Sequence, residues 1–135
     1  MDSVAMSVAR VCLAASYDGT LTFPQVVGKL AEAGFESYAI DFRHATARYY
    51  RPDGDSMELK AHRYDVSIPE VFDAAAVQAA IGEAQRLAPG YTYDGFCRKV
   101  MAAGCTGYVV SFPGRRAVYS GRTAQTHVEE FPQQG

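Results

Sequence analysis

The sequence has few cysteines and no long apolar run. Cys12, Cys97 and Cys105 form no C-x-x-C pair and lie inside apolar segments, where a free thiol behaves as a small hydrophobic side chain. No run approaches the roughly 20 apolar residues of a membrane span, and the first residues lack the basic segment and apolar stretch of a signal peptide. We therefore expect a protein of a reducing compartment, the cytoplasm, with no membrane partner.

The sequence also lacks a strong charge imbalance and the common catalytic motifs. Its net charge of −2 argues against nucleic acid as a partner. No G-x-S-x-G elbow, P-loop or dinucleotide fingerprint occurs, so we expect no cofactor. His44, His62 and His127 are scattered without a zinc-ligand spacing, so we expect no metal. A loop around Gly19 resembles the centre of an EF-hand but offers one carboxylate, too few for a calcium site.

What the sequence does have is an internal repeat. A shift of 70 residues places residues 3–59 over residues 73–129 without a gap, and such self-similarity outranks other signals of fold. We interpret the chain as a single domain, 1–135, made of two tandem repeats joined by a linker at 60–72. One repeat alone would be marginal as a folding unit. The identical pairs with the most weight are Ala33/Ala103, Gly34/Gly104, Tyr38/Tyr108, Phe42/Phe112 and Tyr49/Tyr119.

Each repeat predicts two helices followed by three strands. The apolar spacing is helical up to the Ala-Gly pairs at 33–34 and 103–104, and it then becomes alternating. Thr22, Asp73 and Thr92 are candidate helix N-caps. We therefore expect an α+β fold with pseudo-twofold symmetry, in which helices cover one face of a mostly antiparallel sheet of about six strands.

The first helix and the linker carry more specific expectations. Ser3 is the candidate N-cap of a helix that extends to about Ala15. The apolar stripe of this helix, at helical spacing, consists of Val4, Val8, Val11 and Ala15. The linker contains Pro69 and is compatible with part of an edge strand.

A polar set near the end of the chain is the first candidate site. If residues 126–130 form a strand, His127 and Glu129 point to the same face and are a candidate catalytic acid–base pair. The candidate ligand-binding residues around them are Arg115, Arg116, Tyr119 and Arg122. Arginine forks there would hold an anion. The alternative is that these are ordinary residues of a solvated sheet face.

A second polar set lies in the hairpin region of the first repeat and comprises Arg43, Arg48 and Tyr50. If the two hairpin regions lie near each other, their Arg and Tyr side chains would form a patch suited to phosphate, carboxylate or single-stranded nucleic acid. The alternative is again structural, because turns are exposed and exposed positions are commonly charged.

Several motifs together resemble a known family. They are the segments at 23–27, 49–54, 96–105, 111–116 and 126–129, and the most specific are Ala-Gly-Cys at 103–105 and Phe-Pro-Gly-Arg-Arg at 112–116. The family comprises short bacterial and prophage proteins of unknown function, often labelled "phage envelope protein". The resemblance implies a single-domain soluble bacterial protein, and it brings no established activity and no catalytic residues.

The leading functional hypothesis is a non-catalytic binding or interaction module that uses its Arg/Tyr-rich hairpins. Its expected partners are a small anionic ligand and a second copy of the chain in a homodimer. One alternative is a small enzyme in which His127 and Glu129 act on an anionic substrate. Another is a phage structural component, which follows from the family label alone.

Overall fold

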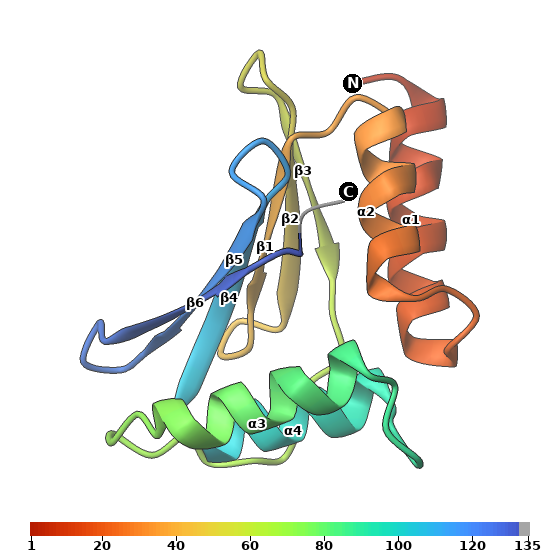
Figure 1. Ribbon diagram of the computed structural model, residues 1–135. Coiled ribbons are helices and arrows are strands. Elements are labelled where there is room, and N and C mark those ends of the chain that lie inside the picture. The colour runs from red at the N-terminus through yellow and green to blue at the C-terminus, as the bar shows by residue number, and fades with distance from the viewer. Residues whose placement is uncertain (133–135) are drawn as a thin grey trace.

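The computed structural model describes residues 1–132 and contains four helices and one six-stranded antiparallel sheet (Figure 1). The predicted α+β class and order of elements are confirmed. In chain order the elements are α1 (Ser3–Asp18), α2 (Phe23–Glu32), β1 (Ser37–Asp41), β2 (Thr46–Tyr50), β3 (Ser56–Lys60), α3 (Ala74–Gln85), α4 (Tyr93–Ala102), β4 (Cys105–Ser111), β5 (Arg116–Gly121) and β6 (Thr126–Glu130). Within residues 1–132, none of the helices has the length and apolar character that crossing a membrane requires.

The sheet has the strand order β3-β2-β1-β4-β5-β6, and neighbouring strands are antiparallel. β1 and β4 pair at its centre, where Ala39 lies opposite Val109 and Tyr38 lies opposite Val110. From this central pair each half continues outward as a hairpin and then an edge strand. The β1–β4 pairing therefore joins the two halves of the sheet.

Local capping explains where three of the helices begin. The carboxylate of Asp73 accepts a hydrogen bond from the N–H of Ala76 at the start of α3, and the hydroxyl of Thr92 caps α4. α2 begins with a capping box formed by Thr22 and Gln25. Each cap satisfies backbone N–H groups that the first helical turn leaves unpaired. These three predicted starts are confirmed.

The first helix differs from the prediction at both ends and in its buried face. Asp2, not Ser3, is the N-cap of α1, and the helix continues to Asp18, followed by the C-cap Gly19 with a φ of 77°. The predicted stripe is wrong at Val4 and Val11, which are 71% and 58% exposed, and is confirmed at Ala15, which is buried. The buried side chains are Ala5, Ala9, Cys12 and Ala15. Helical spacing alone does not distinguish this face of small residues, which permits close packing, from the valine face beside it.

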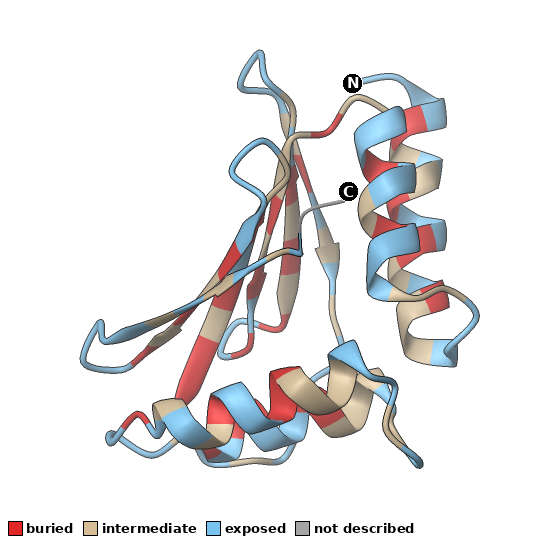
Figure 2. Ribbon diagram, in the orientation of Figure 1, coloured by how far each residue is buried: buried red, intermediate tan, exposed pale blue. Residues whose placement is uncertain are grey.

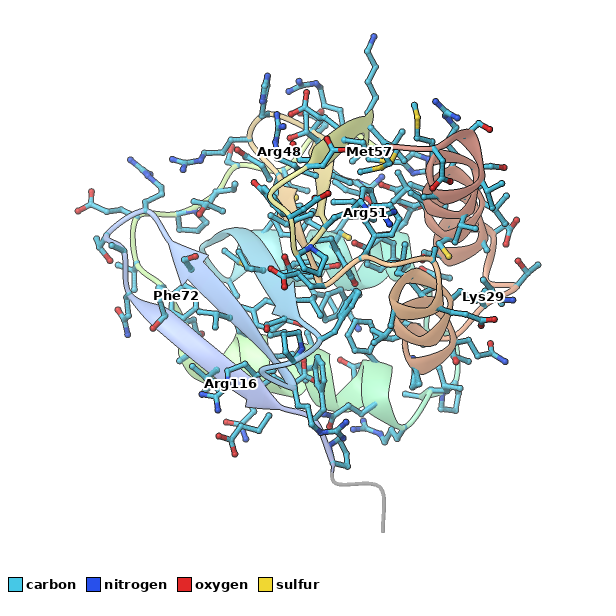
Figure 3. The ribbon with its side chains drawn as sticks, turned by 90° about the horizontal axis from the view of Figure 1, so that it is seen from above. Lys29, Arg48, Arg51, Met57, Phe72 and Arg116 are labelled. Atoms are coloured by element: carbon cyan, nitrogen blue, oxygen red, sulfur yellow. The ribbon has the colours of Figure 1, made fainter. Side chains whose placement is uncertain are left out.

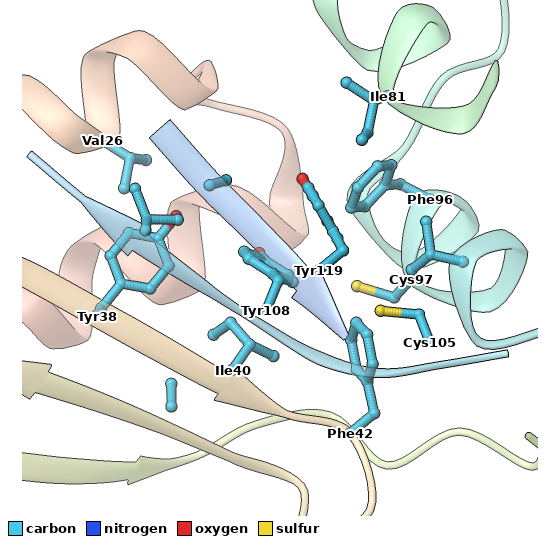
Figure 4. Packing of buried hydrophobic residues seen from close by; sticks show 14 of the residues in the cluster. Val26, Tyr38, Ile40, Phe42, Ile81, Phe96, Cys97, Cys105, Tyr108 and Tyr119 are labelled. Atoms are coloured by element: carbon cyan, nitrogen blue, oxygen red, sulfur yellow. The ribbon is translucent and has the colours of Figure 1, made fainter. Parts of the chain in front are cut away.

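The buried face of the sheet is rich in tyrosine. Tyr38, Tyr49, Tyr108 and Tyr119 are each no more than 6% exposed, and Figure 4 shows three of them among the apolar side chains of strands and helices. Buried and exposed positions alternate along the strands (Figure 2). The hydroxyls of Tyr93 and Tyr108 share a hydrogen bond of 2.6 Å. Within residues 1–132, no fully buried side-chain nitrogen or oxygen lacks a hydrogen-bond partner.

The linker between β3 and α3 forms no strand, so the prediction of an edge strand there is wrong. Its alternating residues Tyr64, Val66 and Ile68 pack their side chains against the core without pairing the backbone to a strand. The linker ends at Phe72, which is 5% exposed. A Cβ at Gly121 would lie 2.7 Å from the Phe72 ring. The linker is therefore held by the packing of side chains.

Gly107 is required for the central strand pairing. A Cβ at this residue would lie 2.3 Å from the carbonyl oxygen of Ile40 in β1. We expect Gly107→Ala to lower the free energy of unfolding by about 2–4 kcal/mol, because the added methyl must separate β1 from β4. Urea denaturation followed by circular dichroism measures the change.

Gly28→Ala is the matched control for this prediction. Gly28 lies inside α2, and an added Cβ there meets no atom within 4 Å. The same substitution is expected to raise the free energy of unfolding by about 0.5–1 kcal/mol, because alanine is the better helix former. A Gly107→Ala protein as stable as the wild type would contradict the close approach of β1 and β4.

Candidate binding groove between α1 and β3

An open groove of about 530 Å³ lies between α1 and the edge strand β3. This volume is within the range of small-molecule sites, about 300–1,000 Å³. The lining residues are Arg10, Leu13, Ala14, Tyr17 and Asp18 from α1, Leu59 and Lys60 from β3, and His62 from the linker.

The secondary structure explains why these residues meet. Arg10, Leu13 and Tyr17 are spaced by three and four residues, so they lie on one side of α1. On β3, alternation places Leu59 on the same face as the buried Met57. The groove therefore has an apolar wall, with charged side chains where α1 and β3 reach solvent.

His62 closes one end of the groove. Its ring stacks on that of Tyr17 with centroids 3.4 Å apart, and its backbone N–H donates to the Tyr17 hydroxyl at 2.9 Å. Its Nδ1 lies 3.0 Å from the carboxylate of Asp94, and the hydroxyl of Tyr64 donates to the same oxygen at 2.6 Å. These contacts orient the ring, and they leave Nε2 without a hydrogen-bond partner among the residues that the structure describes.

The charge state of Asp94 decides which hydrogen bonds His62 can offer. Burial raises the pKa of Asp94, but hydrogen bonds from Tyr64 and His62 lower it by more, so the net shift is downward. An ionised carboxylate only accepts hydrogen bonds, so Nδ1 of His62 is the donor in this pair. Nε2 is then an acceptor when the ring is neutral and a donor when it is charged.

Two cations at the groove are free to meet an anion. Arg10 and Lys60 are exposed and form no ion pair within residues 1–132. The acidic residue in the lining, Asp18, is already engaged by Thr20, whose hydroxyl and backbone N–H donate to its carboxylate at 2.6 and 2.9 Å. These bonds lower the pKa of Asp18. The groove thus combines available positive charge with apolar surface.

The predicted pair, His127 and Glu129, lies on one face of β6, but Glu129 is engaged elsewhere. Its carboxylate accepts hydrogen bonds from the Tyr119 hydroxyl at 3.2 Å and from Nε2 of Gln85 at 2.8 Å. Burial raises the pKa of Glu129, although these donors and the nearby His127 oppose the shift. Glu129 therefore acts as the acceptor for a buried tyrosine and links β6 to α3.

The arginines predicted to accompany this pair have other partners. Arg115 and Arg122 donate to backbone carbonyls at 2.7 and 3.2 Å. A guanidinium nitrogen of Arg116, in β5, lies 3.8 Å from a carboxylate oxygen of Glu130, in β6. Glu130 and Glu129 point to opposite faces of β6, because side chains alternate along a strand. The three arginines therefore do not converge on His127 and Glu129.

The two Arg/Tyr hairpin regions are not brought together. Because β1 and β4 are antiparallel neighbours, the β1–β2 turn with Arg43 and the β4–β5 turn leave opposite ends of the sheet (Figure 1). Arg48 pairs with Glu58 at 2.6 Å, and Tyr50 is 36% exposed on the same face of β2. Figure 3 shows Arg48 and Arg116 on separate parts of the molecule.

The groove is not predicted from the sequence, because the linker at 60–72 has the pattern of a simple connection and His62 has no other histidine or cysteine near it in the sequence. The spacing of Arg10, Leu13 and Tyr17 was a readable signal of one helix face. No such signal links His62 to Asp94, which lies 32 residues away. Only tertiary packing brings these two residues together.

Neither metal-site geometry nor similarity to known proteins assigns a function. Within residues 1–132, no group of three His, Cys, Asp or Glu side chains is arranged to hold a metal ion. No protein-family model matches the chain, and no curated protein matches it. The function must therefore be argued from the geometry of the groove.

The raised pKa of Glu129 predicts a specific pH dependence of stability. The folded protein holds this proton more tightly than the unfolded chain, whose ordinary value is 4.5. Stability contributed by the protonated group is therefore lost as pH rises from 4.5 through the folded pKa. We expect Glu129→Gln to raise the melting temperature at pH 7 and to have little effect at pH 4, as measured by thermal denaturation across that range.

Glu130→Gln is the matched control, because Glu130 is 74% exposed on the other face of β6. It should leave the pH profile close to that of the wild type. A Glu129→Gln protein that is less stable than the wild type throughout, with the same pH slope, would show that the ionised carboxylate stabilises the fold.

Proposed function

We propose that the protein binds a small organic anion with an apolar body in the groove between α1 and β3. The observation that carries this proposal is the combination of two free cations, Arg10 and Lys60, with an apolar wall. An anionic group gains charge-assisted hydrogen bonds from the cations. An apolar body displaces water from the wall, which is favourable because it removes apolar surface from solvent. Carboxylates and phosphate monoesters both have the required chemistry.

His62 supplies the directional contact in this site. Its ring is held on one side by Tyr17 and at Nδ1 by Asp94, so Nε2 has a fixed position at the end of the groove. A fixed polar atom in an otherwise apolar and charged site determines the orientation of the ligand. His62 is therefore the residue expected to discriminate among anions of similar size.

Acid–base catalysis by His62 is a second candidate. It is favoured by the contact with Asp94, since a carboxylate on one ring nitrogen orients the other as a general base. In this role His62 would take a proton from the substrate or from a water molecule. Binding is the prerequisite of both functions and is the first property to test.

We infer further that the fold arose by duplication of a helix-helix-strand-strand-strand unit. In support, a shift of 70 residues maps both ends of α2 onto those of α4 and both ends of β3 onto those of β6. It also maps the start of β2 onto the start of β5. Two backbone hydrogen bonds also correspond: Phe42 N–H donates to Thr106 O, and Phe112 N–H donates to Glu36 O. The same shift relates the two donors to each other and the two acceptors to each other. Alternating burial along the strands supports the placement of all helices on one face (Figure 2).

We also propose a reducing compartment and membership of the phage-associated family that the motifs resemble. Cys12, Cys97 and Cys105 are free and buried. Burial raises the pKa of Cys97 to about 12 and that of Cys105 to about 11, so these thiols stay protonated and unreactive. A role in a phage particle rests on the family label alone.

Charge reversal at Arg10 and Lys60 tests the binding function. Phenylacetate, octanoate and adenosine monophosphate each place one anionic group on an apolar or aromatic body, and thermal shift followed by calorimetry measures their binding. For a probe that binds, the Arg10→Glu/Lys60→Glu protein should lose roughly tenfold or more in affinity, equivalent to about 1.4 kcal/mol. Binding should also weaken with added salt, because the cations are exposed.

Lys29→Glu/Arg86→Glu is the matched control, since both residues are exposed and neither lines the groove. It makes the same change in net charge and should leave the affinity unchanged. Equal losses in the two double variants would indicate a non-specific charge effect, and no response to any of the three probes would also count against the proposal.

A further inference from the structure

β6 is an edge strand, and within residues 1–132 its outward backbone groups pair with no other strand. The N–H of Phe131 donates to the carbonyl oxygen of Arg115, and the N–H of Gly121 donates to the carbonyl oxygen of Gln125. The backbone groups at odd-numbered positions of β6 therefore point toward β5. By alternation, the N–H and C=O groups of the even positions 126, 128 and 130 point away from the sheet. Figure 1 shows β6 at the near edge of the sheet. Such an edge is a template for another strand.

β6 lacks the lysine and proline that most often protect an edge, although Glu129 and Glu130 are charged. Residues 126–130 contain no Lys, Arg or Pro, and Val128 at their centre is 44% exposed. Natural edge strands commonly carry such residues to prevent pairing. Val128 also ends an apolar row across the exposed sheet face, in which register places Val118 beside it, then Val109, then Ala39. The edge is thus continuous with an exposed apolar surface.

β6 is complementary to a second copy of itself. An antiparallel pair centred on Val128 sets Val128 against the partner's Val128 and joins the two apolar rows. It also sets His127 opposite the partner's Glu129, which is a favourable cross-strand pair. The outward groups at 126, 128 and 130 then form about six backbone hydrogen bonds across the twofold axis.

We propose that β6 pairs with β6 of a second copy, antiparallel and centred on Val128, to form a homodimer with one continuous sheet. The β1–β4 pair, centred on Ala39 and Val109, is an arrangement of the same kind within the chain. In the dimer α3, which contacts β6, approaches its counterpart near the axis.

The other edge, β3, is unsuited to the same pairing. Its outward backbone positions are 56, 58 and 60, because Arg51 N bonds Asp55 O and Ala61 N bonds Ala45 O. A self-pair centred on Glu58 would place two glutamates opposite each other, and like charges in register destabilise a strand pair. Lys60 adds a second charged side chain at that edge. The proposed partner surface is therefore β6 alone.

Proline and lysine at two matched positions test the proposal. Val128→Pro removes an outward N–H and no internal hydrogen bond, and Val128→Lys keeps the N–H but adds a charge to the edge. Glu58→Pro and Glu58→Lys make the same changes at the corresponding position of β3. Sedimentation velocity over a range of concentrations, with circular dichroism as the check of folding, measures the oligomeric state.

We expect the wild type and both Glu58 variants to be dimers, and the Val128→Lys protein to be a folded monomer with a dissociation constant raised roughly tenfold or more. The Val128→Pro protein, if circular dichroism shows that it folds, should also be a monomer. Amide exchange by NMR should show protected N–H groups at 126, 128 and 130 in the wild type and unprotected ones in Val128→Lys. A monomeric wild type, a dimeric Val128→Lys protein or monomeric Glu58 variants would each overturn the proposal.

Discussion

The antiparallel pairing of β1 with β4 is the constraint on which the rest of the structure depends. Its midpoint, Ala39 opposite Val109, leaves Tyr38 and Tyr108 on the buried face of the sheet. A slip of one residue between the two strands would place the two tyrosines on opposite faces, so that one strand would turn its buried side chains toward solvent. If the two halves arose by duplication, this midpoint is where the pseudo-twofold axis crosses the sheet, because the shift of 70 residues maps Ala39 onto Val109. One register therefore positions both hairpins, both edges and both helical pairs.

The candidate groove exists because the two halves are not equivalent away from this midpoint. Ala15 and Leu59 correspond, by the 70-residue shift, to Gln85 and Glu129. In the second half these two residues form a hydrogen bond that joins α3 to β6. In the first half the corresponding side chains cannot bond, and the linker occupies the end of the space through His62 and its stack on Tyr17. A side-chain hydrogen bond thus joins helix to edge strand in the second half, whereas in the first half the groove lies between α1 and β3.

Local signals predict the helices and strands, whereas the buried face of α1 and the strand order depend on long-range packing. Caps such as Asp73 and Thr92 act within one helical turn, so their residue types identified the helix starts. The buried face of α1 was mispredicted because Ala9 and Cys12 bury small side chains whose contribution depends on a close neighbour. The sequence leaves open whether the two sets of hairpin arginines are neighbours, because it does not give the strand order. Antiparallel pairing of β1 and β4 sends their turns apart, and nothing in either hairpin encodes that.

The tyrosine-rich core also explains why Glu129 is buried. Four tyrosines on the sheet face bring hydroxyls into a region where an unpaired polar group is costly. The Tyr108 hydroxyl is hydrogen-bonded to that of Tyr93, and the Tyr119 hydroxyl donates to the carboxylate of Glu129. Burial raises the pKa of Glu129. A raised carboxyl pKa is often used as evidence that a residue is a catalytic acid. Here burial at a structural position accounts for the shift, and the partners Gln85 and Tyr119 oppose it. His62, by contrast, has a carboxylate partner and lines an open groove, and its Nε2 has no hydrogen-bond partner within residues 1–132. A perturbed pKa without access to a ligand is therefore weaker evidence of function than an accessible and oriented polar atom.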